Sequence, residues 1–244
     1  MKIALIGYGK MGRAIEETIR QYNSTATEPV EIVLKFNRSN FHELHADTLQ
    51  QADVAIEFTS PATAVYSINT CIKANIPVVV GTTGWYDNLP EVIAYAKSKN
   101  AALLYAPNFS IGVNLFFELN KKLAEMMAKQ KLYKVHIEET HHTEKKDAPS
   151  GTAIKLAEQV IKRYPEKTSW INGESDDETK LEVYAHRISD VPGTHQVIYN
   201  SDEDEIMIQH TAHSRKGFAK GALQAALWLK GKTGVFTMKD VLGI

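Results

Sequence analysis

The first twelve residues, MKIALIGYGKMG, constrain the fold more than any other stretch of this chain. Residues 3–6 are wholly apolar, as in a strand buried on both faces of a parallel sheet. Residues 7–12 have the spacing G-x-G-x-x-G and open a helical repeat of apolar side chains. A strand, a glycine turn and a helix in this order predict a dinucleotide-binding unit, with a pyrophosphate at the helix N-terminus. A glycine turn with only a structural role is the alternative.

Apolar runs alternate with helical repeats through the first hundred residues. The runs lie at residues 30–36, 54–58, 78–80 and 102–105, and the helical repeats at 62–74 and 89–99. This α/β alternation predicts a Rossmann-like, doubly wound parallel sheet. After residue 107 the sequence predicts helices at 115–127, 153–164 and 218–229, and strands at 133–139, 181–188, 194–200 and 204–213. These later strands are joined by turns and by a polar loop at 171–179, which favours a second, antiparallel or mixed sheet.

The overall charge and the cysteine count exclude several classes of function. Lysine and arginine (28) nearly balance aspartate and glutamate (29), so no global field attracts nucleic acid or an anionic membrane. A small-molecule partner is therefore favoured. The single cysteine, Cys71, allows neither an intramolecular disulfide nor a cysteine metal cluster, and we expect it to be a small core residue. The N-terminal apolar run has no cleavage site and is too short to span a bilayer, so we expect a cytoplasmic protein.

The end of the second strand should select the nicotinamide cofactor. The segment there reads KFNR, with Asn37 and Arg38 but no carboxylate to hold the ribose 2′-hydroxyl of NADH. Arg38 suits the 2′-phosphate of NADPH, while Asn37 could still bind a hydroxyl, so the sequence favours NADPH and tolerates NADH. A solvated loop charge is the alternative for Arg38. The loops GTTG at 81–84 and APNFS at 106–110 follow two further strands and should line the nicotinamide side.

The stretch HHTEKKDAPSGTA at 141–153 places histidines and lysines beside the start of a helix. The unpaired amide groups of a helix start attract a carboxylate or phosphate, and histidine can exchange a proton near neutral pH. This combination suits a small acidic substrate with a proton donor close by. Adjacent histidines without a third ligand motif make a poor metal site, so we expect no metal. A capped, charged surface loop, with Ser150 as its N-cap, remains the alternative.

This stretch resembles the signature of the 4-hydroxy-tetrahydrodipicolinate reductase family, whose members are also called dihydrodipicolinate reductases. The resemblance covers nearly the whole chain, because FTSP at 58–61, GTTG, APNFS, VPGTH at 191–195 and SRKGFAKGALQAALWL also have counterparts in that family. Three departures stand out. His136 stands where the family signature often has a glutamate, three residues before Glu139, and we expect it to be a surface residue of its strand. The glycine loop is one residue shorter than the family's usual loop, and Asn37 stands where many members have an acidic ribose contact.

The resemblance implies a discontinuous dinucleotide-binding domain, residues 1–110 and 214–244, with a substrate-binding and oligomerisation domain at 111–213. It implies hydride transfer from NADPH or NADH to a small dicarboxylate substrate, with loss of water, and a homotetramer. It assigns acid–base roles to His141 and Lys145. It implies that the substrate carboxylates are bound by His142, Ser150, Gly151 and Thr152. The cofactor contacts it implies are Gly7, Gly9, Lys10, Met11, Gly12, Arg38, Gly81, Thr82, Thr83, Ala106, Pro107, Asn108 and Phe109. Arg215 and Phe218 fall near the domain junction.

Two other functions remain open from the sequence. Another two-domain NADP-linked reductase of amino-acid metabolism would need its own signature, such as a catalytic cysteine in the aspartate-semialdehyde type. A non-catalytic dinucleotide sensor would keep the glycine turn but would have no use for the histidine–lysine cluster.

Overall fold

The computed structural model describes residues 1–214 and 216–244, and the expected junction role of Arg215 lies outside them. The chain forms two compact units. The first comprises Met1–Ile111 with Lys216–Ile244, and the second is the continuous segment Gly112–Arg215.

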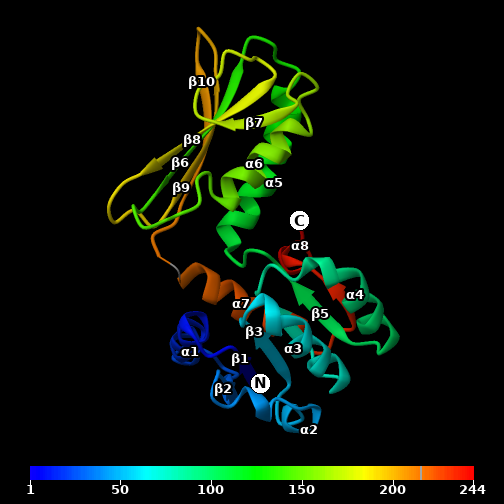
Figure 1. The fold of residues 1–244 in the computed structure, drawn as a ribbon. Helices are drawn as coiled ribbons and strands as arrows, with labels where there is room; N and C mark the ends of the chain where they lie inside the picture. The colour runs from blue at the N-terminus through cyan, green and yellow to red at the C-terminus, as the bar shows by residue number, and fades with distance from the viewer. Residues whose placement is uncertain (215) are drawn as a thin grey trace. The chain divides into compact units, whose positions relative to one another are not determined.

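The first unit is built on a six-stranded sheet in the order β11-β5-β4-β3-β1-β2, and all of its strand pairs are parallel (Figure 1). The strands are β1 (Lys2–Ile6), β2 (Glu31–Phe36), β3 (Val54–Glu57), β4 (Val78–Val80), β5 (Ala102–Tyr105) and β11 (Gly234–Phe236). β1 lies inside the sheet, with β2 on one side of it and β3, β4 and β5 following in chain order on the other side. The prediction of a Rossmann-like parallel sheet is therefore confirmed.

Helices cover both faces of this sheet, which explains the unbroken apolar runs of its strands. One face packs against α2 (Ala46–Leu49), α3 (Pro61–Lys73) and α4 (Leu89–Ser98). The other packs against α1 (Lys10–Asn23), α7 (Lys216–Leu229) and α8 (Met238–Leu242). Two short 3-10 turns, Phe41–Glu43 and Tyr86–Asn88, complete the unit. Cys71 is fully buried in α3, as expected.

Helix α7 packs unusually close to the loop that follows β5. A Cβ atom added at Gly221 would lie 1.8 Å from the carbonyl oxygen of Phe109, so only glycine fits at this point of the helix. Ala219, Ala222 and Ala226 of the same helix are fully buried against the sheet. Small side chains thus bring the backbone of α7 onto the predicted cofactor loop.

The second unit contains a five-stranded mixed sheet in the order β10-β9-β6-β8-β7. Its strands are β6 (Lys134–His141), β7 (Ser169–Asn172), β8 (Lys180–Arg187), β9 (Thr194–Asn200) and β10 (Glu205–Thr211). β9 is antiparallel to β6 and β10, while β8 is parallel to β6 and β7. This confirms the prediction of a mixed sheet.

Helices α5 (Ile111–Met127) and α6 (Gly151–Ile161) pack on one face of the second sheet (Figure 1). The core between them contains Leu156 and Val160 from α6, Leu123 from α5 and Tyr199 from β9. Buried Asn120 ties the helices together, because its Nδ2 donates to the Leu156 carbonyl at 3.2 Å and to Gln159 Oε1 at 3.0 Å. The shared core and this buried contact hold α6 against α5 and the sheet.

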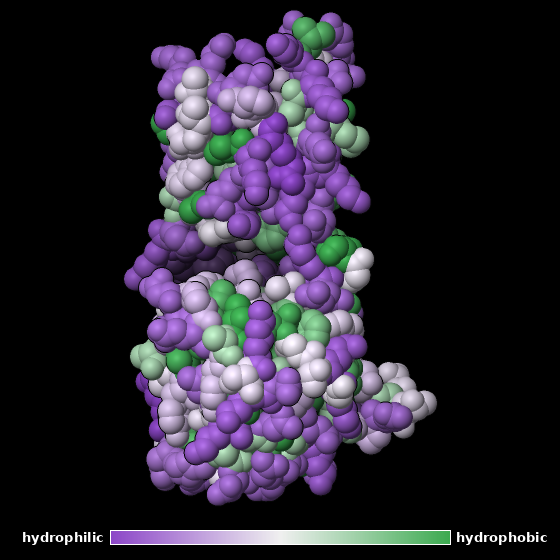
Figure 2. All heavy atoms as spheres, turned by 90° about the vertical axis from the view of Figure 1, so that its right-hand side faces the viewer, coloured by the Kyte–Doolittle hydropathy of each residue, from purple (hydrophilic) through white to green (hydrophobic). Residues whose placement is uncertain are grey.

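Several short elements differ from the sequence-based expectations, among them α2 and the two 3-10 turns of the first unit. Residues 169–172 form β7, so the expected loop at 171–179 is shorter at its start. The tail VFTMKDVLGI contributes β11 and α8, and Thr237 and Asp240 form a capping box at the start of α8. Across the described residues, no helix is both long and apolar enough to cross a membrane. The surface drawn in Figure 2 is mainly hydrophilic, with hydrophobic residues scattered among the polar ones.

Candidate active site

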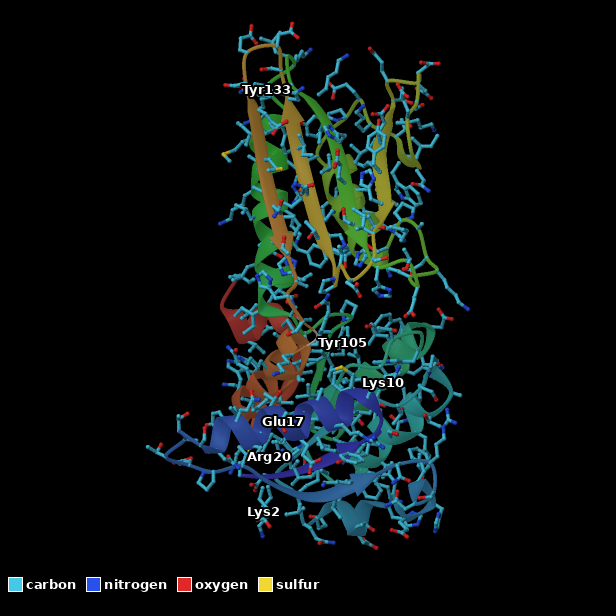
Figure 3. The ribbon with its side chains drawn as sticks, turned by 90° about the vertical axis from the view of Figure 1, so that its left-hand side faces the viewer. Lys2, Lys10, Glu17, Arg20, Tyr105 and Tyr133 are labelled. Atoms are coloured by element: carbon cyan, nitrogen blue, oxygen red, sulfur yellow. The ribbon has the colours of Figure 1, made fainter. Side chains whose placement is uncertain are left out.

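The glycine turn joins β1 to α1 by a sharp change of direction. Gly7 has φ +96°, and a Cβ atom there would lie 2.0 Å from the Phe58 carbonyl oxygen, so no other residue fits. The amides of Gly7 and Tyr8 both donate to the Phe36 carbonyl, at 3.0 and 2.7 Å. Gly9 caps α1 without a side-chain hydrogen bond, and Lys10, Met11 and Gly12 form the first turn of the helix (Figure 3 labels Lys10). The amide groups of this turn can therefore face an anion.

A cleft of about 770 Å³ lies beside this turn. Its lining residues are Gly7, Tyr8, Gly9, Phe36, Asn37, Arg38, Ser39, Phe41, Phe58, Thr59, Ser60 and Thr63. Arg38 is exposed and lies in the turn that follows β2. Lys35 has another partner, because its Nζ lies 2.5 Å from Glu16 Oε1. The structure thus brings Arg38 to the same cleft as the glycine turn.

Glu57 at the end of β3 organises two loops at the carboxyl edge of the sheet. Its Oε1 accepts hydrogen bonds from the Thr59 amide (2.9 Å) and the Thr82 hydroxyl (2.9 Å), and from the Thr59 hydroxyl. The Thr59 amide also donates to Thr82 Oγ1 at 2.7 Å. Burial raises the pKa of the Glu57 carboxyl, and the hydrogen bonds of Thr59 and Thr82 oppose this effect. Sequence reasoning did not identify Glu57, which ties the predicted cofactor loop at 81–83 to the cleft.

The two other predicted cofactor loops lie at the ends of neighbouring strands. Thr82 is buried and Thr83 is exposed after β4, and Phe58 packs its ring against Gly81. After β5, Ala106 and Phe109 are buried, whereas Pro107 is exposed and Asn108 accepts a hydrogen bond from the Ser110 amide at 2.8 Å. The Phe58 and Phe109 rings meet edge-on at 5.8 Å, so Phe58, which follows β3, contacts a residue of each loop. Phe58 lines the cleft of the glycine turn, whereas no residue of the loops at 81–83 and 106–109 does.

In the second unit, His141 ends β6 and lies in a cluster of polar side chains. Its Nε2 is 3.2 Å from His195 Nε2 and 3.6 Å from Glu139 Oε2, and His195 Nε2 is 3.5 Å from the same oxygen. Glu139 is two residues before His141 on β6, so both side chains point to the face that carries α5 and α6. His195 pairs with Glu139 across β6 and β9. Two strands thus bring three titratable groups to one point.

Ser150 connects this cluster to the start of α6. Its side chain accepts from the Ala153 amide at 3.2 Å, which confirms the expected N-cap, and its Oγ lies 3.1 Å from His195 Nε2. The Ser150 amide donates to Glu139 Oε1 at 2.9 Å. Gly151 and Thr152 follow as the first residues of the helix. The helix start is therefore anchored to Glu139.

Glu139 also binds Arg187, whose Nη2 donates to Glu139 Oε1 at 3.2 Å and to the Asp147 carbonyl. Burial raises the pKa of the Glu139 carboxyl, but contacts with His195 and Ser150 outweigh it and lower this pKa to about 2. Burial and the neighbouring His195 lower the pKa of His141 to about 4, against the opposing charge of Glu139. In the free protein at neutral pH, Glu139 is therefore charged and His141 is neutral.

Lys145 and His142 lie outside this buried cluster. Lys145 Nζ is 2.7 Å from both carboxylate oxygens of Asp147. His142 lines a cleft of about 530 Å³ together with Thr143, Glu144, Ser189, Asp190, Val191, Pro192 and Ser214. His142 Nδ1 is buried and has no hydrogen-bond partner among the residues described. The predicted acid–base and substrate residues thus form two groups. His141 and Ser150 belong to the buried cluster, and His142 and Lys145 belong to the loop outside it.

Sequence reasoning missed Glu139, Arg187 and His195 as site residues. Period-2 alternation was a usable signal for Glu139, since it shares a strand face with His141. His195 and Arg187 come from strands that follow later in the chain, and only the register of the sheet brings them to β6. The VPGTH segment, which contains His195, is distinguished in the sequence only by its resemblance to the family.

Comparison with known proteins identifies the family. The family model for the N-terminus of dihydrodipicolinate reductase matches residues 1–109, and the model for the C-terminus matches residues 112–242. The chain belongs to the dihydrodipicolinate reductase family. It is 48% identical over 243 residues to the 4-hydroxy-tetrahydrodipicolinate reductase of Christiangramia forsetii, covering 99% of this chain and 98% of the relative. The reductase of the same name from Rickettsia bellii is 35% identical, over 95% of this chain and 90% of that protein.

A solved structure of the family has the same fold. The dipicolinate-bound dihydrodipicolinate reductase from Paenisporosarcina sp. TG-14 superposes with a TM-score of 0.77, at 23% identity, over 98% of each chain. Membership of this reductase family, together with the Rossmann-like sheet, makes the chain a pyridine-nucleotide-dependent oxidoreductase. The C-terminal family model extends through α7, β11 and α8, which pack in the first unit.

Proposed function

We propose that this chain reduces 4-hydroxy-tetrahydrodipicolinate to tetrahydrodipicolinate, with loss of water, in lysine and diaminopimelate biosynthesis. The observation that carries the proposal is the 48% identity to a reductase of that name, which extends over 99% of the chain. The substrate is a small dicarboxylate, and no nucleic acid or membrane partner is needed. The predicted cytoplasmic location stays a prediction.

In this proposal each of the two units binds one of the two reactants. Residues 1–110 and 214–244 bind the cofactor, and residues 111–213 bind the substrate. The first turn of α1 and the cleft beside it hold the pyrophosphate and ribose, and the loops at 81–83 and 106–109 hold the nicotinamide. The cofactor supplies a hydride to C4 of the substrate. Support comes from the start of α1, where Gly9 provides no side-chain cap for the amide groups, and from the Glu57 contacts that fix the loop at 81–83.

The chain's own residues orient the substrate and supply its proton. The amides of Gly151 and Thr152, the Ser150 hydroxyl and His142 bind the carboxylates at the start of α6, where the helix dipole favours negative charge. The negative charge of two bound carboxylates would favour the protonated form of the neighbouring His141 imidazole. His141 and Lys145 then serve as acid–base groups. Glu139 and His195 hold the His141 ring by the contacts described above.

An absorbance assay tests the reaction. Purified protein should oxidise NADPH when it is mixed with enzymatically generated hydroxytetrahydrodipicolinate, and the reduced-nicotinamide absorbance should fall. Tight NADPH binding without turnover would contradict the proposal and favour a dinucleotide sensor. A reductase of the aspartate-semialdehyde type is disfavoured, because Cys71 is fully buried in α3 and burial raises the pKa of its thiol.

We assign NADPH as the preferred cofactor, with NADH tolerated. Arg38 is exposed at the cleft. Asn37 and Arg38 occupy the position after β2, so no carboxylate stands there to bind the ribose 2′-hydroxyl of NADH. Asn37 Oδ1 accepts hydrogen bonds from the Ser39 amide (2.8 Å) and hydroxyl (2.6 Å), so this side chain shapes the turn that presents Arg38.

Replacing Asn37 by aspartate should shift the preference toward NADH. Aspartate keeps the oxygen that accepts from Ser39 but adds a negative charge, which repels a 2′-phosphate and can bind a 2′-hydroxyl. The ratio of kcat/KM for NADPH to that for NADH should fall at least about tenfold, equal to about 1.4 kcal/mol. Arg38→Ala is the matched variant, and it should lose activity with NADPH but not with NADH. An unchanged ratio in both variants would contradict the assignment.

We also propose a homotetramer that is formed through the second unit. The sheet face opposite α5 and α6 carries Met207, which is 45% exposed and pairs with Ile198 in the register of β10 and β9. Figure 3 shows these strands in front of α5. No described element of the second unit covers Met207, and this supports a partner subunit at the face.

A further inference from the structure

Glu139 and His141 at the end of β6 and His195 on β9 have a geometry that proton exchange does not explain. Three atoms, Glu139 Oε2, His141 Nε2 and His195 Nε2, form a nearly equilateral triangle. Its sides are 3.2 Å between the two nitrogens and 3.6 and 3.5 Å from these nitrogens to the oxygen. Two ligands of a tetrahedral Zn²⁺ site are about 3.3–3.4 Å apart when the Zn–ligand distances are about 2.0–2.1 Å, within about 0.2 Å of the three sides observed here. The triangle therefore has the size of one face of such a site.

Hydrogen bonding alone leaves these atoms poorly satisfied. Glu139 is 1% exposed, and its Oε2 is buried and has no hydrogen-bond partner in the described part of the chain. The second carboxylate oxygen is already occupied, since Oε1 accepts from the Ser150 amide at 2.9 Å and from Arg187 at 3.2 Å. His195 Nε2 faces His141 Nε2, Ser150 Oγ and Glu139 Oε2 at once, although one ring nitrogen offers a single proton or a single lone pair. A cation would use one lone pair from each of the three atoms.

The ligand types select the class of ion. Two imidazole nitrogens and one carboxylate oxygen form the His₂Glu set of open zinc sites, which keep a fourth position for a small ligand. Imidazole-rich sites suit Zn²⁺ and its transition-metal neighbours, whereas Mg²⁺ and Ca²⁺ prefer oxygen ligands. Ser150 and Arg187 orient the carboxylate from outside the triangle, as outer partners do in metal sites.

We propose that Glu139, His141 and His195 form a binding site for a divalent transition-metal ion of the Zn²⁺ class, and that the bound ion inhibits the enzyme. Inhibition follows because the ion occupies the nitrogen of His141 that would otherwise exchange a proton. This second part rests on the proposed reductase function, whereas binding of the ion does not. The site was not expected from the sequence, where His141 and His142 alone make a poor pair of ligands.

Calorimetric titration of ZnCl₂ into metal-free protein tests the binding. The wild type should bind one ion per chain, and Co²⁺ at the same site should give the intense visible absorption of tetrahedral coordination. His195→Asn and Glu139→Gln should each weaken the binding by more than the about 10–100-fold expected for losing an outer partner. Circular dichroism and thermal unfolding verify that each variant is folded.

The other face of β6 offers a matched control. His136 and His186 flank Glu138 there at 3.6 and 3.7 Å, so His136→Asn and His186→Asn remove histidines of similar chemistry from β6 itself and from its neighbour β8. Both should bind Zn²⁺ as the wild type does. Equal binding by wild type and a folded His195→Asn protein, or loss of binding only in the His136 or His186 variants, overturns the site.

The inhibition is measured separately, with metal-free enzyme and NADPH. Added Zn²⁺ should stop turnover, and a chelator should restore it. One ion bound per chain with unchanged turnover overturns the inhibitory role and leaves the binding site standing. A metal-free enzyme that binds Zn²⁺ but turns over no substrate overturns the proposed function and leaves the binding site standing.

Discussion

Purified His141→Gln and Lys145→Ala proteins should each lose about 10²–10⁴-fold in kcat, the typical contribution of a positioned general acid or base. Glutamine cannot exchange a proton at the position of His141 Nε2, and alanine removes the charged amine that faces Asp147 at 2.7 Å. KM for NADPH should change little, because neither side chain belongs to the cofactor unit. Steady-state kinetics at saturating NADPH and substrate measure the effect.

Lys146→Ala is the matched control for this pair of variants. Lys146 follows Lys145 in the same loop, carries the same charge and is exposed. Its replacement should leave kcat near the wild-type value. If folded His141→Gln and Lys145→Ala proteins both keep near-native kcat, the acid–base assignment is wrong.

Replacing Gly221 by alanine should destabilise the cofactor unit. The new Cβ would meet the Phe109 carbonyl oxygen at 1.8 Å, and that oxygen belongs to the backbone and cannot turn away. Such overpacking costs about 1–3 kcal/mol or more, and exceeds the gain of about 1 kcal/mol that alanine brings to a helix interior. Helix α7 or the 106–109 loop must shift, so KM for NADPH should rise. Differential scanning calorimetry and cofactor titration measure the two effects.

Gly217→Ala separates the steric effect from helix propensity. Gly217 is in the same helix, but a Cβ atom there would lie 3.8 Å from Ser110 Oγ, an ordinary contact. This variant should be at least as stable as the wild type. A Gly221→Ala protein with unchanged unfolding temperature and cofactor affinity would contradict the close packing of α7.

The parallel sheet and most of its helices could be predicted because their signals are local. Each buried strand is a short apolar run, and each helix repeats its apolar residues every three or four positions. β11 could not be predicted in this way. It consists of three residues, Gly234–Phe236, whose extended form depends on pairing with β5 at the edge of the sheet.

The candidate site was predictable only where its residues are consecutive. The start of α6 could be read from one stretch of sequence, since Ser150 caps the helix that Gly151 begins. His195 is 54 residues from His141, and its place is set by the pairing of β9 with β6. Arg187 reaches Glu139 in the same way from β8, which pairs with the other side of β6. Long-range register thus decides which groups surround His141.

β11 belongs to the first sheet and α7 packs on it, although both lie near the C-terminal end of the sequence. This arrangement affects the order in which the two units can fold during synthesis. The sheet face formed by Ile3, Leu5 and Val79 is buried by α7, a helix that is synthesised more than a hundred residues after β4. The second unit is continuous in the chain and contains its own core, so it can fold first. We therefore expect a nascent chain to carry a folded second unit beside an incomplete first sheet, whose open apolar face chaperones can bind until residues 216–244 emerge.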